Sequence, residues 1–117
     1  MKIFVYGTLM SGESNHFFLE ERFSKYIRKA VTERGYTLYD LDGFPGMVTG
    51  GTGAVIGEIY DVCARTRRRL DQLEGHPQFY RRHIIRLQDG EKVEAYILEV
   101  GYTRGCPVIK SGDWRNK

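Results

Sequence analysis

The spacing of apolar and polar positions predicts short strands through most of this chain. Residues 2–6 form a compact apolar run rich in β-formers, which is typical of a buried strand. The same reasoning predicts strands over residues 26–32, 35–40, 54–62, 80–87 and 92–100. Gly57 interrupts the expected strand at 54–62, which indicates either a bulge or a close approach by another backbone.

Helical signals are confined to two short segments. A helix is expected over residues 16–22, where Ser14 or Asn15 is placed to cap its start. A second helix is expected over residues 66–73, capped by Thr66 and ended by Gly75.

Turn signals separate these elements and set the fold class. Asp42-Gly43 and Asp89-Gly90 predict tight turns, and the glycine-rich residues 44–53 are expected to form a loop. Many short strands without βαβ alternation predict an α+β fold, namely a small mixed β-barrel flanked by short helices. The length of 117 residues predicts a single domain over residues 1–117.

Composition and charge argue against several classes of protein. With 18 Lys and Arg against 15 Asp and Glu, the formal net charge is only +3, so nucleic-acid binding is not favoured. Cys63 and Cys106 lack a Cys-x-x-Cys pattern and the three histidines lack metal-ligand spacing, so no metal site is expected. No stretch approaches the ~20 apolar residues of a membrane helix or resembles a signal peptide, so a cytoplasmic protein is expected.

The first candidate site is Tyr6-Gly7-Thr8-Leu9, where the first strand runs into a loop. A glycine followed by a small hydroxyl residue exposes consecutive backbone N–H groups, which form a concave nest for a carboxylate or an oxyanion. Glycine would also let a ligand approach the backbone closely. The alternative is an ordinary exit from a strand into a loop.

The second candidate is Glu74, which shares a helix face with Leu70 and Leu73 and directly precedes Gly75. Burial and the negative end of the helix dipole both disfavour a charged carboxylate, so both would raise the pKa of Glu74. A raised carboxyl pKa is what a general acid/base needs near neutral pH. Alternatively, Glu74 turns out into water or pairs with an arginine. Asp71, one turn earlier, is expected to be solvated.

The third candidate is Tyr80-Arg81-Arg82, at the start of the strand after Glu74. Strand alternation places Tyr80 and Arg82 on one face and Arg81 on the other. Arg82 could hold a substrate carboxylate through a bidentate pair, or orient Glu74. The alternative is a structural ion pair on a surface strand.

Four short motifs follow one another along the chain. They are Phe4-Val5-Tyr6-Gly7-Thr8-Leu9, Gly57-Glu58-Ile59-Tyr60, Leu70-Asp71-Gln72-Leu73-Glu74-Gly75 and Tyr80-Arg81-Arg82. Together with the closing Lys110-Ser111-Gly112-Asp113-Trp114, they closely resemble the γ-glutamylcyclotransferase-like superfamily, in particular short members related to γ-glutamylamine cyclotransferases. The resemblance covers nearly the whole chain, and it implies the small mixed barrel of that family.

The resemblance also implies roles for the candidate residues. The backbone of Tyr6, Gly7, Thr8 and Leu9 would cradle the glutamyl group of a substrate. Glu74 would match the catalytic acid/base carboxylate of the family.

Tyr80 and Arg82 would match the tyrosine and arginine that follow this carboxylate in the family and are expected to bind substrate. Phe44, Pro45 and Met47 either line the mouth of the pocket or serve packing.

The implied reaction closes a γ-glutamyl group into 5-oxoproline and releases an amine or an amino acid, with neither metal nor cofactor. The alternative is a non-catalytic module that binds a small carboxylate on the same fold. In both cases the expected partner is a small molecule, not nucleic acid or membrane, and the oligomeric state is left open.

Overall fold

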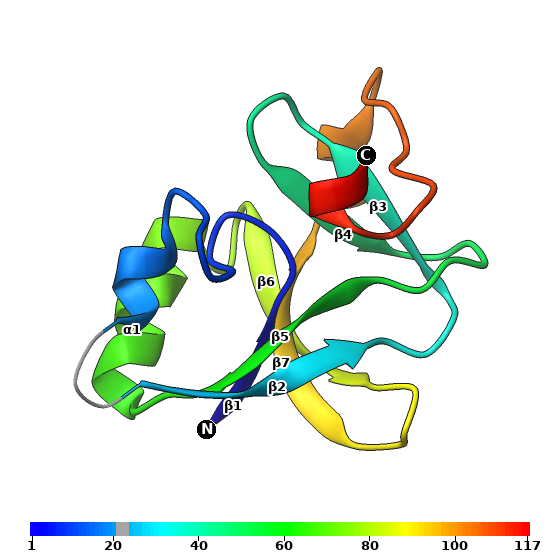
Figure 1. Cartoon of the computed structure of the whole chain (residues 1–117). Helices are drawn as coiled ribbons and strands as arrows, with labels where there is room; N and C mark the ends of the chain where they lie inside the picture. Colours follow the sequence, from blue (N-terminus) through cyan, green and yellow to red (C-terminus); the bar gives the residue numbers. More distant parts are fainter. Residues whose placement is uncertain (21–23) are drawn as a thin grey trace.

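A computed structural model describes residues 1–20 and 24–117 of the chain. Within these residues, five strands form one sheet in the order β2-β5-β1-β7-β6 (Figure 1). Their bounds are β1 Lys2–Val5, β2 Lys25–Val31, β5 Ile56–Asp61, β6 Tyr80–Arg86 and β7 Lys92–Leu98. The α+β class with a mixed sheet, predicted from the sequence, is therefore confirmed.

Strand β1 lies at the centre of this sheet. It pairs antiparallel with β5 and parallel with β7, so that Phe4 lies opposite Ile59 on one side and Ala95 on the other. Ile3 and Phe4 are fully buried. An uninterrupted apolar run is what a strand covered on both faces requires.

Gly57 in β5 allows another backbone to approach closely. Of the two expectations for this residue, a bulge or a close approach, the close approach is confirmed. A Cβ atom at position 57 would overlap the carbonyl oxygen of Val5 and lie 2.7 Å from the ring of Phe4. The irregularity between β2 and β5 lies elsewhere, between Tyr26 and Arg28.

The sheet does not close into a barrel, so that part of the predicted fold is wrong. Within the described residues, its outer strands β2 and β6 meet only at their ends, through an isolated bridge between Thr32 and Leu87 and a hydrogen bond from the Gln88 N–H to the Val31 carbonyl at 2.9 Å. The Glu33 N–H also donates to the Arg86 carbonyl at 3.0 Å. Past this point both chains turn away, and the ladder that closure needs is not formed.

Strands β3 (Tyr36–Asp40) and β4 (Pro45–Thr49) form a separate two-stranded sheet. The prediction of a loop over residues 44–53 is thus wrong for β4. Leu38 pairs with Met47, and both side chains are buried, so core packing overrides the glycine-rich composition. The predicted turn at Asp42-Gly43 joins the two strands.

Helix α1 (Ala64–Glu74) starts after Cys63, which stands at the cap position in place of the predicted Thr66. It ends as predicted, because Gly75 adopts the left-handed conformation with φ 66° and ψ 35°. Leu70 is fully buried and fixes one face of the helix. No helix of the described chain is long and apolar enough to cross a membrane.

Short 3₁₀ turns complete the described structure, and Figure 1 shows the first of them beside α1. They are η1 (His16–Leu19), η2 (Val100–Thr103) and η3 (Trp114–Asn116). Asn15 precedes η1 as expected, but its side chain makes no capping hydrogen bond. Part of the helix predicted over 16–22 lies outside the described residues.

Candidate functional site

A cavity of about 300 Å³ lies where the end of β1, the end of α1, the start of β6 and the β3–β4 turn come together. Its lining combines backbone, aromatic rings and one described acidic side chain. The lining residues are Phe4, Val5, Tyr6, Gly7, Thr8, Leu9, Ser14, Asn15, Gly43, Phe44, Pro45, Leu73, Glu74, Phe79, Tyr80 and Tyr96. The structure thus brings together all of the predicted site residues except Arg82.

Residues 7–9, called the amide loop below, present unused backbone donors at this cavity. Within residues 1–20 and 24–117, the N–H groups of Gly7, Thr8 and Leu9 donate no hydrogen bond. Buried backbone donors are almost always paired, so three consecutive free ones beside a cavity indicate a place for an anionic or carbonyl oxygen.

The carbonyl side of the amide loop is held by the segment that follows it. Asn15 donates from its backbone N–H to the Thr8 carbonyl at 2.8 Å and from Nδ2 to Thr8 Oγ1 at 2.9 Å. The Leu9 carbonyl lies 2.9 Å from Nδ1 of His16. These contacts fix the loop while leaving its N–H groups free. Asn15, expected to cap a helix, instead holds the amide loop, a role that its local sequence does not indicate.

Gly7 has a packing role that the sequence did not indicate. A Cβ atom at this position would lie 2.5 Å from Cγ of Pro45. The glycine therefore makes room for β4 to pack against the loop, while the close approach of a ligand to Gly7 stays a prediction.

Glu74 lines the cavity from the last position of α1. Its carboxylate has no hydrogen bond or ion pair within the described residues. Burial raises the pKa of Glu74 from its ordinary value of 4.5 to about 7. Leu73, expected beside it on a buried stripe, is instead 37% exposed at the cavity mouth.

Tyr6 and Tyr80 join the cavity wall to strand β4. Tyr6 donates to the carbonyl of Tyr96 at 2.7 Å and accepts from the N–H of Met47 at 3.1 Å, while Tyr80 donates to the Pro45 carbonyl at 2.6 Å. Burial first, and the charge of Glu74 in addition, raise the pKa values of both phenols. Both hydroxyls therefore stay protonated near neutral pH.

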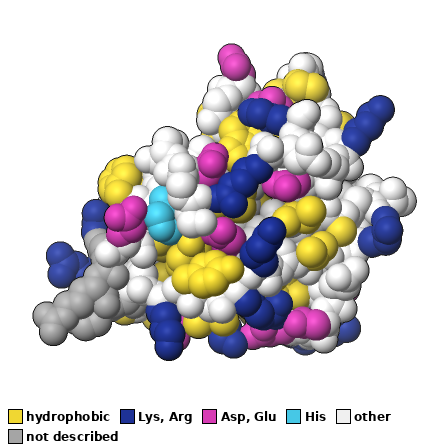
Figure 2. Space-filling view, in the orientation of Figure 1, with side chains coloured by type: hydrophobic (Ala, Val, Ile, Leu, Met, Phe, Trp, Pro, Cys, Tyr) yellow, Lys and Arg dark blue, Asp and Glu magenta, His cyan; other side chains and the backbone are white. Residues whose placement is uncertain are grey.

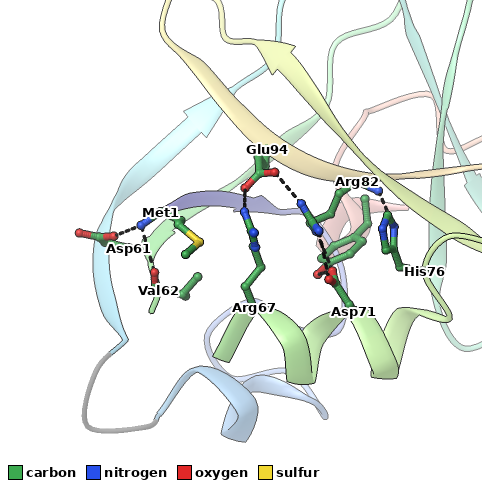
Figure 3. A network of polar contacts seen from close by, with 9 residues as sticks. Met1, Asp61, Val62, Arg67, Asp71, His76, Arg82 and Glu94 are labelled. Carbon is green, nitrogen blue, oxygen red and sulfur yellow. Dashed lines mark hydrogen bonds and ion pairs between the residues drawn. The ribbon is translucent and has the colours of Figure 1, made fainter. Parts of the chain in front are cut away.

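Arg82 lies outside the cavity, in the polar network of Figure 3. Its guanidinium donates to both carboxylate oxygens of Asp71 at 2.7 and 3.1 Å, and to Glu94 at 2.7 Å. Asp71 also accepts from the hydroxyl of Tyr96 at 2.7 Å. The expectation that Asp71 is solvated is therefore wrong, and the alternative of a structural ion pair describes Arg82.

The three residues expected either to line the mouth of the pocket or to serve packing are divided between these two roles. Phe44 and Pro45 line the cavity, whereas Met47 is fully buried in the core.

On the face shown in Figure 2, basic and acidic side chains are interspersed. Within the described residues, no group of three or more His, Cys, Asp and Glu side chains could hold a metal ion.

Tyr96 is a cavity residue that sequence reasoning missed. The hairpin register pairs Arg82 with Tyr96, four steps from the pair of Arg86 and Lys92 beside the turn. Counting outward from the Asp89-Gly90 turn would have placed Tyr96 next to the predicted site.

Comparisons of the sequence and the fold with known proteins found a matching family model, similar relatives and similar solved structures. A family model described as gamma-glutamyl cyclotransferase, AIG2-like, matches residues 3–116. A Vibrio cholerae protein provisionally named gamma-glutamylcyclotransferase is 42% identical over 112 residues, covering 96% of this chain and 93% of that protein. A Niallia circulans protein named gamma-L-glutamyl-butirosin B gamma-glutamyl cyclotransferase is 35% identical over 72 residues, which is 62% of this chain and 44% of that protein.

Among solved structures, the crystal structure of c4763, a uropathogenic E. coli-specific protein, is similar with a TM-score of 0.85. It is 29% identical in sequence, and the match covers 97% of this chain and 91% of that chain. A solved chain of nearly the same length thus has a similar fold.

Proposed function

Because this chain belongs to the gamma-glutamyl cyclotransferase, AIG2-like family, we propose that it is a γ-glutamyl cyclotransferase with Glu74 as general acid and base. The observation that carries the proposal is that a partly buried carboxylate and a loop of amides, neither of them with a partner among residues 1–20 and 24–117, line the same cavity. The names of the Vibrio cholerae and Niallia circulans relatives support the same reaction.

The proposed reaction converts a γ-glutamyl amide into 5-oxoproline and an amine or amino acid. The α-nitrogen of the glutamyl group attacks its own γ-carbonyl carbon, a five-membered lactam forms, and the bond to the leaving nitrogen breaks. The ammonium group loses two protons and the leaving nitrogen gains two, so no water and no further reactant is consumed. Because the nucleophile belongs to the substrate itself, correct positioning supplies much of the rate.

Glu74 would carry those protons from the attacking to the leaving nitrogen. A carboxyl group with a pKa of about 7 gains and loses a proton readily at neutral pH. The amide loop would bind the substrate carboxylate or the oxyanion that develops on the γ-carbonyl oxygen. A cavity of about 300 Å³ is at the lower end of the range for small-molecule sites.

The second candidate function is a module that binds a small carboxylate without turnover. The free amides of the loop favour it, because they need only an anion. The position of Glu74 speaks against it, since a negative side chain beside a carboxylate site weakens anion binding.

The deciding experiment is incubation with a panel of γ-glutamyl amines and γ-glutamyl dipeptides, followed by measurement of released 5-oxoproline. We expect turnover of at least one compound, and a Glu74→Gln variant about 10² to 10⁴ times slower. A Glu33→Gln variant is the matched control, because Glu33 is exposed and lies outside the cavity lining.

Binding of glutarate without any 5-oxoproline release would replace the enzyme with the binding module. Unchanged turnover in Glu74→Gln would remove Glu74 from the mechanism. The cytoplasmic location and the absence of nucleic-acid and membrane partners stay predictions of the sequence.

A further inference from the structure

Glu58 is a buried carboxylate for which the proposed reaction has no use. It lies on β5 directly opposite Val5, the last residue of β1, and is only 4% exposed. A buried charge is costly unless it is paired. Its partners therefore indicate what it contributes.

The partners of Glu58 come largely from the end of the segment that carries the amide loop. Ser11 donates to Glu58 from its backbone N–H at 2.8 Å and from its hydroxyl at 2.9 Å. Tyr60 donates from its hydroxyl at 3.0 Å. Burial alone would raise the pKa of Glu58, but these hydrogen bonds and the nearby Arg115 bring it below its ordinary value. The carboxylate is therefore ionised and fully engaged.

The C-terminal turn η3 holds the same segment from another side. Arg115 Nη1 lies 3.7 Å from Glu58, and the same guanidinium donates to the carbonyl of Ser11. Trp114 donates from Nε1 to Glu13 at 3.1 Å. Residues more than 100 positions apart in the chain are thus tied together just beyond the amide loop.

The span from Val5 to Ser11 is consequently fixed at both ends. The pairing of Val5 with Glu58 holds its start, and Ser11 returns to the same Glu58 side chain. Between them, the Met10 N–H donates to the Gly7 carbonyl at 3.0 Å. The free amides lie inside this short closed span, so Ser11 holds its end while Asn15 and His16 hold the carbonyl groups of the loop.

We propose that Glu58 is a positioning residue, which holds the amide loop at the cavity by anchoring Ser11. This inference rests on the proposed function, in which the loop amides bind the substrate. The role differs from that of Glu74, because Glu58 acts only through the loop and does not touch the reacting atoms.

The test compares variants that remove one bond each from the same carboxylate. Ser11→Ala removes one of the two donors by which Ser11 binds Glu58. Tyr60→Phe removes a donor to Glu58 that lies on β5, away from the segment that carries the amide loop. A small displacement of binding groups costs up to roughly 100-fold in rate, and we expect Ser11→Ala to lower kcat/KM by about tenfold. Tyr60→Phe is expected to change kcat/KM less than about threefold at a comparable loss of thermal stability.

Ser11→Thr, which keeps the hydroxyl, is expected to restore kcat/KM. Glu58→Gln is expected to lower kcat/KM at least as far as Ser11→Ala does. In this variant the charge-assisted hydrogen bonds from the N–H and the hydroxyl of Ser11 become neutral ones. Equal losses in Ser11→Ala and Tyr60→Phe, or no rescue by Ser11→Thr, would reduce Glu58 to a stabilising residue and overturn the proposal.

A second readout separates this inference from the proposed function. The backbone amide resonances of Gly7, Thr8 and Leu9 are followed by NMR while glutarate is added to each variant. We expect Ser11→Ala and Glu58→Gln to shift these resonances and weaken glutarate binding, and Tyr60→Phe to leave both unchanged. If the wild type releases no 5-oxoproline, the proposed function fails while this result still decides the role of Glu58. Unshifted amides in all variants would overturn that role, whatever the activity.

Discussion

Glu74 and Glu58 are two partly or fully buried carboxylates of this chain, and they are in opposite electrostatic situations. Glu74 has no partner within the described residues, and burial raises its pKa to about 7. Burial acts on Glu58 as well, but hydrogen bonds from Ser11 and Tyr60 outweigh it and leave the pKa of Glu58 below its ordinary value. Burial alone therefore does not raise the pKa of a carboxyl group; burial without hydrogen-bond donors does.

The elements that carry the two residues explain this difference. Glu74 ends a helix, where the backbone presents carbonyl groups and therefore no donor to a carboxylate. Glu58 lies inside a strand next to the loop segment, which presents both the N–H and the hydroxyl of Ser11. The predictions below test whether the chemistry of the protein follows this contrast.

The largest expected effect is the pH dependence of turnover. Because Glu74 must be ionised to accept a proton, kcat/KM should rise with pH through a midpoint of about 7. Between about pH 8 and pH 5 the rate should then fall by roughly 100-fold. The measurement is kcat/KM for 5-oxoproline release across this range, with the Glu58→Gln variant retaining the same midpoint. A midpoint near 4.5 in the wild type would show that Glu74 does not act with a raised pKa.

The second prediction concerns stability, because Glu74 is expected to weaken the fold that it serves. Its pKa is higher in the folded than in the unfolded chain, so its contribution is most favourable below about pH 4.5 and is lost as the pH rises through about 7. Glu74→Gln should therefore raise the free energy of unfolding by about 2 kcal/mol at about pH 8 and change it little at about pH 4. Urea unfolding at both pH values measures this, with Glu33→Gln as control. A variant less stable than the wild type at the higher pH would contradict the unpaired state of Glu74.

Local signals in the sequence were sufficient to name Glu74 and the amide loop as candidates, and the resemblance of the motif order to a family then favoured the functional interpretation of both. The position of Glu74 depends on helical spacing from Leu70 and on the stop at Gly75, both of which act within a few residues. The amide loop likewise follows directly from the end of an apolar strand. Such features are visible in the sequence because no distant partner is needed to form them.

Features that depend on distant partners were not predicted. Strand β4 exists because Met47 reaches the core and pairs with Leu38, and the sheet stays open because β2 and β6 diverge after one bridge. The sequence also gives no sign that Asp71 engages Arg82, since the two come together only when the β6–β7 hairpin packs on α1.

The third prediction concerns the Arg82 network, which supports the helix that carries Glu74. Arg82→Ala leaves Asp71 and Glu94 without their main partner, so we expect the free energy of unfolding to fall by about 1.5 kcal/mol. Arg81→Ala is the matched control on the same strand. The Arg81 guanidinium is exposed and makes only a long contact of 4.0 Å with Glu99. The free energy of unfolding should therefore change by no more than about 0.5 kcal/mol.

Arg82→Ala also tests the sequence-based expectation that Arg82 holds a substrate carboxylate. From the position of Arg82 outside the cavity, we expect KM to change no more than about threefold in Arg82→Ala protein that remains folded. A rise in KM of about 100-fold without loss of stability would restore Arg82 as a binding residue.

The smallest expected effect is the loss, at acidic pH, of the stability that Glu58 contributes. Its pKa is lower in the folded than in the unfolded chain, so its contribution is present above about pH 4.5 and is lost as the pH falls through the lowered value. The stability gap between the wild type and Glu58→Gln should therefore narrow as the pH falls from about 6 to about 4. Over the rise from about pH 4 to about pH 8, the gap between Glu74→Gln and the wild type should widen, with the variant the more stable. Urea unfolding of the three proteins at these pH values measures both slopes. If the wild type lost stability relative to both variants as the pH rises, burial alone would govern the two carboxylates, and the contrast between paired and unpaired would be wrong.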